Sequence, residues 1–117
     1  MTFTLPWPPS VNHLFYTHGG RRHLSAKGRQ YHKDSSALVL ASKDRPISPI
    51  AGPIGLEIRA FPPDRRRRDL SNLVKVVEDS LTIAGVWEDD SQVDDLRVVR
   101  EGVCAGGKVI VTVWALA

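Results

Sequence analysis

Residues 62–85 read PPDRRRRDLSNLVKVVEDSLTIAG, and this stretch decides the architecture around it. Two prolines end the preceding segment, four consecutive arginines follow, and an apolar residue then recurs every three or four positions. That spacing predicts an amphipathic helix with one face toward a core. Asp69 or Ser71 can cap the start of this helix, and Gly85 stands where a left-handed glycine ends one. The apolar stripe consists of Leu70, Leu73, Val74, Val77 and Leu81.

Four strands are predicted around this helix because apolar and polar residues alternate in short runs there. The last run has apolar residues at successive positions, which indicates that both faces of the sheet are covered at that strand. Proline and glycine residues mark the ends of the runs. The predicted strands cover residues 2–5, 54–61, 93–100 and 108–114.

The segment before the second strand predicts a hairpin and a further helix. Gly19 and Gly20 favour a turn within residues 11–24, whose basic tip is then exposed. Ser25 offers an N-cap for a helix over residues 27–43, although the apolar stripe is weak in its first half. The expected fold is α+β (mixed α/β), in the order β, hairpin, α, β, α, β, β, with the helices packed on a mixed sheet.

The chain has 117 residues and a mass of 13.0 kDa, which favours a single domain over residues 1–117. A domain this small buries only about two-thirds of its unfolded surface, so a second copy would add useful burial. Cys104 is the single cysteine and can form no disulfide within the chain. The first residues lack the features of a signal peptide. No apolar run approaches the roughly 20 residues of a membrane helix. We therefore expect a cytoplasmic protein without a membrane partner.

Charge is divided unevenly along the chain. Residues 1–68 hold 12 Lys and Arg against 4 Asp and Glu, a balance of +8, whereas residues 69–117 hold 4 against 9, a balance of −5. A basic half suits a polyanionic partner and an acidic half can hold a metal ion, although surface charge can also segregate without a function.

The four consecutive arginines, Arg65, Arg66, Arg67 and Arg68, lie between a predicted strand end and a helix start. Guanidinium groups pair well with phosphate oxygens, and the following helix start adds backbone N–H groups and a positive dipole end. The alternative is a solvated charge run without a ligand. Four further basic residues are either phosphate contacts or ordinary surface residues: Arg21, Arg22, Lys27 and Arg29.

Carboxylates occur at both ends of the predicted second helix. Asp69 stands at its start, and Glu88, Asp89 and Asp90 follow its end. A helix of about 14 residues spans about 21 Å, so the chain must return along it before the two groups can meet. The sequence therefore permits a metal site with two carboxylates without establishing one.

The order of these motifs resembles the RusA family of Holliday-junction resolvases. The resemblance is carried by PPDRRRRDLSNLVKVVEDSLTIAGVWEDDSQVDDLRV, by the opening LPWPPSVN and by the later basic RRHLSAKGRQY. It runs in order from about Leu5 to the C-terminal strands, and it is far more specific than a single short motif. The resemblance implies a homodimeric, Mg²⁺-dependent endonuclease, with Mn²⁺ as a substitute, that cuts four-way DNA in a bacterial or phage-infected cell.

The resemblance also implies roles for particular residues. Asp69, directly after the arginine run, is similar to a metal-binding catalytic aspartate, and Asp90 in the segment WEDD resembles another. Lys75 is similar to the family's catalytic lysine, which stabilises charge on the phosphate. Asn72 also matches the family pattern.

One position departs from the family pattern. The family reads D-L-D-N, whereas residues 69–72 of this chain read D-L-S-N. Ser71 therefore replaces a further catalytic aspartate with a neutral, weaker ligand for a hard cation. Ser71 can hold metal through a water; Asp64, Asp89 or another nearby acid can compensate; or the protein binds junctions and cuts them poorly. A substitution made to trap a complex is a fourth explanation.

Two other functions stay open. The first is a junction-binding module without efficient catalysis. Such a module keeps the arginines and the dimer, and the serine at position 71 then reflects loss of the catalytic site. A small structural or protein-interaction domain would instead use the arginines on acidic partners, and it would bind DNA weakly at physiological salt.

Trp7, Phe15 and Tyr16 can stack on unpaired bases, or they can pack in the core or the dimer interface.

Overall fold

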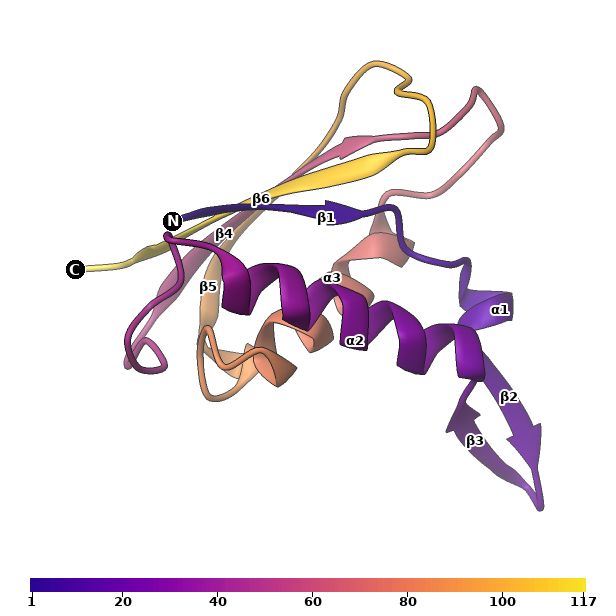
Figure 1. Cartoon of the computed structure of the whole chain (residues 1–117), viewed down its shortest axis with the longest axis horizontal. Helices are drawn as coiled ribbons and strands as arrows, with labels where there is room; N and C mark the ends of the chain where they lie inside the picture. Colours follow the sequence, from indigo (N-terminus) through magenta and orange to yellow (C-terminus); the bar gives the residue numbers. More distant parts are fainter.

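The computed structural model describes all 117 residues, and its elements are shown in Figure 1. The four predicted strands are confirmed, each within one residue of its predicted bounds, and both predicted helices are confirmed. The elements are β1 (Thr2–Pro6), α1 (Val11–Leu14), β2 (Phe15–His18), β3 (Arg21–Leu24), α2 (Ala26–Ala41), β4 (Ile54–Phe61), α3 (Ser71–Ile83), the 3-10 helix η1 (Asp90–Gln92), β5 (Val93–Arg100) and β6 (Lys108–Ala115).

Four strands form one mixed sheet in the order β1-β6-β4-β5. Strand β6 is antiparallel to both β1 and β4, whereas β4 and β5 are parallel. A parallel pair needs a long crossover, and the arginine run, α3 and η1 together supply it here. The expected α+β fold with helices on a mixed sheet is confirmed, and the crossover contains every candidate site residue from Asp64 to Asp90.

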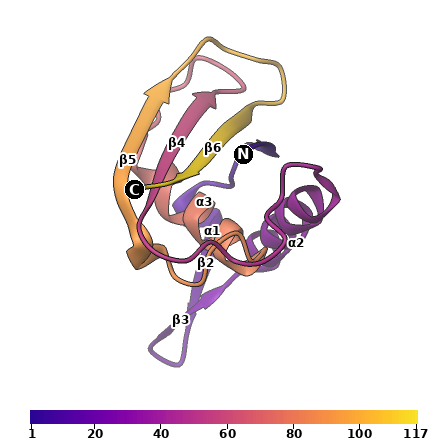
Figure 2. The same cartoon turned by 90° about the vertical axis from the view of Figure 1, so that its left-hand side faces the viewer.

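One face of the sheet builds the core, and α2 and α3 both lie on that side (Figure 2). Leu56 and Ile58 of β4 are fully buried, and the alternate residues of β6 beside them are equally buried. Leu73, Val77 and Leu81 of α3 belong to the same core cluster. Each fully buried aliphatic side chain contributes about 1.5–3 kcal/mol, so this layer holds α3 firmly against the sheet.

The opposite face of the sheet has no helix over it (Figure 2), so the expectation that both faces are covered is wrong. Ile110 and Trp114 lie on this face, and the indole ring of Trp114 covers Gly55 so closely that a Cβ atom there would collide with it. Arg97 and Glu57 pair across two strands at 3.3 Å. Apolar residues on both sides of a strand therefore did not require a second layer of helices.

Helix α3 ends as predicted but begins differently. Gly85 has a φ of +78°, the left-handed conformation that closes a helix. At the start, Leu70 is already helical, and the Asn72 backbone N–H bonds to the Asp69 carbonyl at 3.2 Å. No side chain accepts a hydrogen bond from the first turn, so the expected cap by Asp69 or Ser71 is wrong. Both side chains are left available for an external ligand.

Helix α2 begins as predicted, with the hydroxyl of Ser25 accepting a backbone hydrogen bond of the first turn at 3.0 Å. Its inward face is partly polar, which explains the weak apolar stripe. His32 Nδ1 lies 2.7 Å from Ser80 Oγ of α3, and both residues are buried. Burial lowers the pKa of His32 more than the charge of Asp79 raises it, so the neutral imidazole is favoured between the helices.

The predicted hairpin is confirmed as β2 and β3, which project away from the four-stranded sheet (Figure 1). One turn of helix, α1, precedes the hairpin and was not predicted. Gly19 and Gly20 form the tip with φ values of +60° and +73°, as a tight turn of this kind requires. A small second cluster around Leu14 holds the base of the hairpin, while Arg21 and Arg22 are exposed.

Candidate active site

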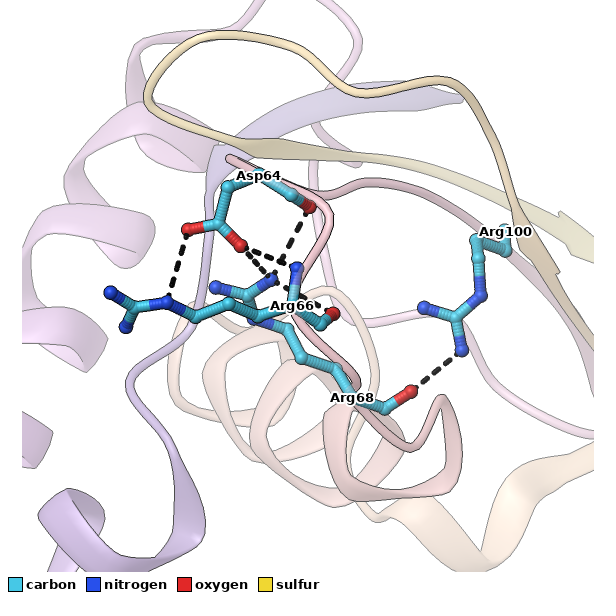
Figure 3. A network of polar contacts seen from close by, with 4 residues as sticks. All are labelled: Asp64, Arg66, Arg68 and Arg100. Atoms are coloured by element: carbon cyan, nitrogen blue, oxygen red, sulfur yellow. Dashed lines mark hydrogen bonds and ion pairs between the residues drawn. The ribbon is translucent and has the colours of Figure 1, made fainter.

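The four arginines belong to a loop between β4 and α3 that folds around Asp64, and we call residues 64–68 the arginine loop (Figure 3). Asp64 Oδ1 accepts hydrogen bonds from the Arg66 backbone N–H at 2.9 Å and from Arg68 Nη1 at 2.7 Å. Arg100 of β5 donates from Nη2 to the Arg68 carbonyl at 2.6 Å. One carboxylate thus closes the loop, and one strand residue anchors it.

These contacts keep Asp64 ionised. The hydrogen bond from Arg68, and after it the backbone hydrogen bond of Arg66, lowers the pKa of the Asp64 carboxyl to about 2. The same hydrogen bond raises the pKa of Arg68. Arg65 and Arg67 are exposed, and Arg66 leaves 83% of its side chain accessible. The loop therefore presents three guanidinium groups to solvent, which suits a run of phosphates.

Asp69 and Asn72 lie where the arginine loop meets α3. Both residues are exposed, and both line a cleft of about 590 Å³ between the loop, the start of α3 and the segment at residues 7–13. The Asp69 carboxylate takes part in no ion pair or hydrogen bond of its side chain. A free carboxylate beside several guanidinium groups can bind a cation next to a phosphate.

The structure places Asp90 in contact with Lys75 of α3. The sequence alone had not decided whether the chain returns to this helix. Lys75 Nζ lies 2.5 Å from Asp90 Oδ2, although the two residues are 15 positions apart. The return of the chain is held by Gln92, whose side-chain amide donates to the carbonyls of Ile50 and Gly52, both at 2.8 Å. A distant loop therefore sets the position of Asp90 against the helix.

Asp89 shapes the turn that carries Asp90. Its carboxylate accepts a hydrogen bond from the Ser91 backbone N–H at 3.0 Å, and the Gln92 side-chain oxygen accepts one from the Asp89 N–H at 3.0 Å. This reciprocal pair is a capping box. The hydrogen bonds to Ser91 lower the pKa of Asp89. Asp89 is thus a residue that positions its neighbour.

Lys75 has a second acidic partner that the sequence analysis missed. Asp79 Oδ1 lies 2.9 Å from Lys75 Nζ, one helical turn further along α3. Hydrogen bonds to Asp90 and then to Asp79 raise the pKa of Lys75. The spacing of four residues between Lys75 and Asp79 was the available signal. We call Lys75, Asp79 and Asp90 the acid–lysine cluster.

Glu78 adjoins the acid–lysine cluster without an ion pair of its own. Burial raises its pKa, the charge of Asp90 adds to that increase, and Lys75 opposes it. The raised pKa of Glu78 therefore reflects its burial first and the nearby charge of Asp90 second.

Ser71 lies one helical turn before Lys75 and shares its side of α3. Asp64 and Asp89, the two acids considered as replacements for the missing aspartate, are engaged in hydrogen bonds of their own. Asp79 is the further carboxylate on the Ser71 side of the helix. Asp79 lies two helical turns beyond Ser71 and is itself paired with Lys75, so it is no freer to substitute for residue 71 than the other two acids.

Two carboxylates of this region each have at least one oxygen without a partner in the chain. The carboxylate of Asp69 is unpaired, and Asp90 has its Oδ2 on Lys75 while Oδ1 has no partner. No three acidic, histidine or cysteine side chains come together as a complete metal cage. Mg²⁺ usually takes one or two carboxylates, several waters and substrate phosphates, so a full cage is not needed.

The basic residues of the N-terminal half are separate from the arginine loop. Arg21 and Arg22 lie on the hairpin, where the Arg22 guanidinium is 3.9 Å from the centre of the Phe15 ring. Arg29 donates to a backbone carbonyl of β3 at 2.8 Å, and Lys27 is exposed in the first turn of α2. The structure thus offers two basic surfaces, the hairpin with the start of α2 and the arginine loop.

The three aromatic residues considered for base stacking differ in burial. Trp7 packs against the main core, with Arg68 at 5.7 Å from its ring centre, and Phe15 packs against the small cluster under the hairpin. Tyr16 is 50% exposed and stacks on His23 with 5.2 Å between ring centres. Tyr16 therefore leaves half of its surface open to a ligand, and part of Trp7 lines the cleft beside Asp69.

No helix in the structure combines the length and the apolar character that crossing a membrane requires.

Comparison with known proteins assigns the family. The sequence pattern of the family described as Endodeoxyribonuclease RusA matches residues 6–113. The chain is 45% identical over 112 residues to the crossover junction endodeoxyribonuclease RusA of Escherichia coli (strain K12), covering 96% of this chain and 92% of the relative. It is 46% identical over 110 residues to the protein of that name from Enterobacteria phage 82, covering 94% and 90%. The chain therefore belongs to the RusA family of endodeoxyribonucleases.

Proposed function

We propose that the protein is a Mg²⁺-dependent, structure-selective endonuclease that resolves Holliday junctions by paired phosphodiester hydrolysis. The observation that carries the proposal is the Lys75–Asp90 contact of 2.5 Å on the helix that the arginine loop leads into. It joins a cation in the middle of the crossover to a carboxylate near its end, 15 positions later. The name crossover junction endodeoxyribonuclease, carried by relatives at 45% identity, supports the substrate class.

In this proposal Asp69 and Asp90 hold the metal ion, and Mn²⁺ can replace Mg²⁺ because it accepts the same oxygen ligands. When bound, the ion would polarise the phosphate as a Lewis acid. Asp69 contributes an unpaired carboxylate at the start of α3, and Asp90 contributes the oxygen that Lys75 leaves free. Asn72, exposed beside Asp69, can hydrogen bond to the bound nucleotide.

Lys75 acts as a fixed cation toward the phosphate. Its pKa is raised, so the ammonium group is charged at neutral pH and cannot serve as a base. Asp79 and Asp90 hold the ammonium group from two sides. From that position Lys75 offsets the negative charge that develops on the phosphoryl oxygens during hydrolysis.

The arginines place the DNA strand. Arg65, Arg66 and Arg67 bind consecutive phosphates of the strand being cut, while Arg68 shapes the loop through Asp64. The hairpin and the start of α2 contact a second segment of backbone through Arg21, Arg22, Lys27 and Arg29. These contacts are electrostatic, so affinity should fall steeply as salt concentration rises.

We further propose that the protein acts as a homodimer. A four-way junction presents two symmetry-related strands, and two copies related by a twofold axis can meet both. The uncovered sheet face, which includes Ile110 and Trp114, supports association because a strand face with partly exposed apolar residues gains burial from a second copy. Light scattering coupled to gel filtration should give twice the chain mass of 13.0 kDa.

A second candidate function is junction binding with weak or absent cleavage. One observation favours it: Ser71 occupies the position of a family aspartate, and no group of three acidic side chains gathers around it. The arginine loop and the hairpin are unaffected by that replacement. Such a protein would keep its affinity for branched DNA and lose the chemistry.

The test is cleavage of an end-labelled four-way junction with Mg²⁺, beside a linear duplex and an EDTA control. We expect paired, symmetric nicks on the junction alone, and loss of those nicks in Asp69→Asn with binding retained. Equal cutting by Asp69→Asn would overturn the site assignment. A protein that binds the junction tightly and never nicks it would support the second candidate.

Ser71→Asp separates an impaired enzyme from a compensated one. If the parent chain cuts slowly and Ser71→Asp cuts much faster, residue 71 limits the reaction. If the parent already cuts well and Ser71→Asp changes little, another oxygen ligand fulfils that role. Ser71→Ala is the matched control, because it removes the hydroxyl without adding charge.

A further inference from the structure

The cleft beside Asp69 has two walls of different chemistry. One wall is the segment from Trp7 to His13, and the other consists of the arginine loop and the start of α3 with Asn72. The volume of about 590 Å³ falls within the range of sites that take small organic groups. Asp69 lines the cleft, so a group inside it would lie next to this proposed metal ligand.

Most of the wall formed by residues 7–13 is apolar and poor in hydrogen-bond donors, and Ser10 and His13 are its polar members. Pro8 and Pro9 have no backbone N–H, and Trp7 and Val11 add apolar surface. A phosphate would find little to bind along Trp7, Pro8 and Pro9. The face of a flat aromatic ring fits such a wall because stacking and apolar contact need no donors.

Two polar side chains face the cleft from opposite walls. His13 Nδ1 lies 3.0 Å from Ser10 Oγ, and the backbone N–H of His13 donates to the Ser10 carbonyl at 2.9 Å. These contacts hold the imidazole in place and leave Nε2 without a partner in the chain. Asn72 is exposed on the other side and carries both a donor and an acceptor.

We propose that this cleft receives one unpaired nucleobase of the strand being cut, next to the phosphate held by the arginine loop. The proposal rests on the proposed nuclease function. Trp7 and Pro9 contact the face of the base, while His13 and Asn72 hydrogen bond to its edge, as polar side chains do in other single-strand sites. His13 and Asn72 are then specificity-determining residues, and the base beside the cut decides how fast a junction is cleaved.

A nucleotide is the occupant that matches both walls together. Its phosphate is anionic and suits Arg66, Arg67 and the positive end of α3, and its base is flat and partly apolar. Bases at a branch point are more easily unpaired than bases within a duplex, so extrusion there needs less free energy. The cleft would therefore favour cutting at the branch over cutting in a duplex arm.

The first experiment is a library of four-way junctions with randomised nucleotides around the branch, cut with Mg²⁺ and read by sequencing. We expect the parent to differ by about tenfold or more among the four bases at one position next to the cut, the scale of one base-reading contact. His13→Ala should reduce that spread below about threefold while total junction binding is unchanged. Leu38→Ala, on the exposed side of α2, is the control and should keep the parental preference.

A second experiment reads the cleft without cleavage. Junctions carrying 2-aminopurine at single positions near the branch are bound in the presence of EDTA, and fluorescence is recorded because this base reports loss of stacking. We expect one position to respond in the parent and not in Val11→Trp, which fills the cleft without removing a polar group. The parental response should also persist in Asp69→Asn.

The outcomes separate the two proposals. Junction cleavage with equal rates for all bases and no 2-aminopurine response would overturn the cleft proposal and leave the nuclease function standing. A 2-aminopurine response without cleavage would support the cleft and overturn only the nuclease proposal. No junction binding at all would overturn both.

Discussion

The arginine loop and the acid–lysine cluster lie on the same crossover but are built in different ways. The loop is closed by hydrogen bonds between residues two and four positions apart, Arg66 and Arg68 to Asp64. The cluster depends on Lys75 meeting Asp90 across 15 positions, and on Gln92 bonding to Ile50 across 42. Short-range contacts thus close the basic loop, with Arg100 of β5 as its distant anchor, whereas the acidic cluster depends on the packed fold.

This difference teaches where each half of the proposed function resides. Affinity for phosphates needs exposed guanidinium groups, and a short segment can present them with few distant contacts. Phosphodiester hydrolysis needs charges held at defined positions, and only a packed scaffold supplies these. Binding should therefore tolerate changes to the acid–lysine cluster, and chemistry should not.

Asp90→Asn tests most directly whether chemistry depends on the acid–lysine cluster while binding does not. We expect cleavage of a four-way junction to fall on the order of a hundredfold or more, because one proposed metal ligand and one partner of Lys75 lose their charge together. Junction affinity, measured by gel shift in EDTA, should stay within about twofold. Asp94→Asn, which removes an exposed carboxylate of β5, is the matched control. An unchanged cleavage rate in Asp90→Asn would show that the cluster is not the reaction centre.

The reverse variant removes charge from the loop and leaves the cluster intact. Arg66→Gln with Arg67→Gln should weaken junction binding by about tenfold and lower the slope of log affinity against log salt by about two, since each lost phosphate contact removes about 0.9. The single-turnover cutting rate of saturated complex should change much less. Arg45→Gln, in the loop before β4, serves as a control for loss of basic charge. An unaltered salt slope would contradict phosphate binding by these two arginines.

Asp79→Asn tests how Lys75 is shared within the cluster. With one partner gone, Lys75 pairs only with Asp90 and competes more strongly with Mg²⁺ for that carboxylate. We expect the Mg²⁺ concentration for half-maximal cutting to rise about two- to fivefold, the effect of an ion pair worth up to about 1 kcal/mol. Asp34→Asn on α2 is the surface control. A Mg²⁺ requirement equal to that of the parent would show that Asp79 does not influence metal binding at Asp90.

The smallest expected effect is a pH dependence confined to the arginine loop. The pKa of Asp64 is about 2 in the folded chain and 3.8 in its ordinary state, so its pairing stabilises the loop above pH 3.8 and that stabilisation is lost as pH falls toward 2. NMR titration of the Asp64 carboxyl carbon should show this low midpoint together with a change at the Arg68 guanidinium. In Asp64→Asn the Arg68 signal should not respond over that range. A midpoint near 3.8 would mean that the loop is open in solution.

Most of the secondary structure could be predicted because it rests on periodicity and turn chemistry. The run from Leu70 to Leu81 predicted α3, and Gly85 predicted its end, because both signals act within a few residues. The start of α3 could not be predicted as reliably. Leu70 is helical in the fold, so the first amides bond to backbone carbonyls and the polar side chains of Asp69 and Ser71 are not needed as caps.

The candidate site divides in the same way. Asp69, Lys75, Asp90 and the arginines were named from the order of residues and the family resemblance, and their roles stay predictions until cleavage is measured. The capping role of Asp89 and the pairing of Asp79 with Lys75 came only from the fold. The spacing of Lys75 and Asp79 permits a contact on any helix, but a third group, Asp90, makes that contact part of a site.

By itself the sequence determined the two long helices α2 and α3, the strands, the basic loop and the family. Each of these follows from neighbouring residues or from motif order. Only the tertiary structure decided that Asp90 returns to Lys75, that the outer face of the sheet is uncovered, and that residues 7–13 form a cleft with the arginine loop. The physical reason is the range of the forces involved. Helix and turn propensities act over a few residues, whereas the meeting of distant side chains depends on how the whole core packs.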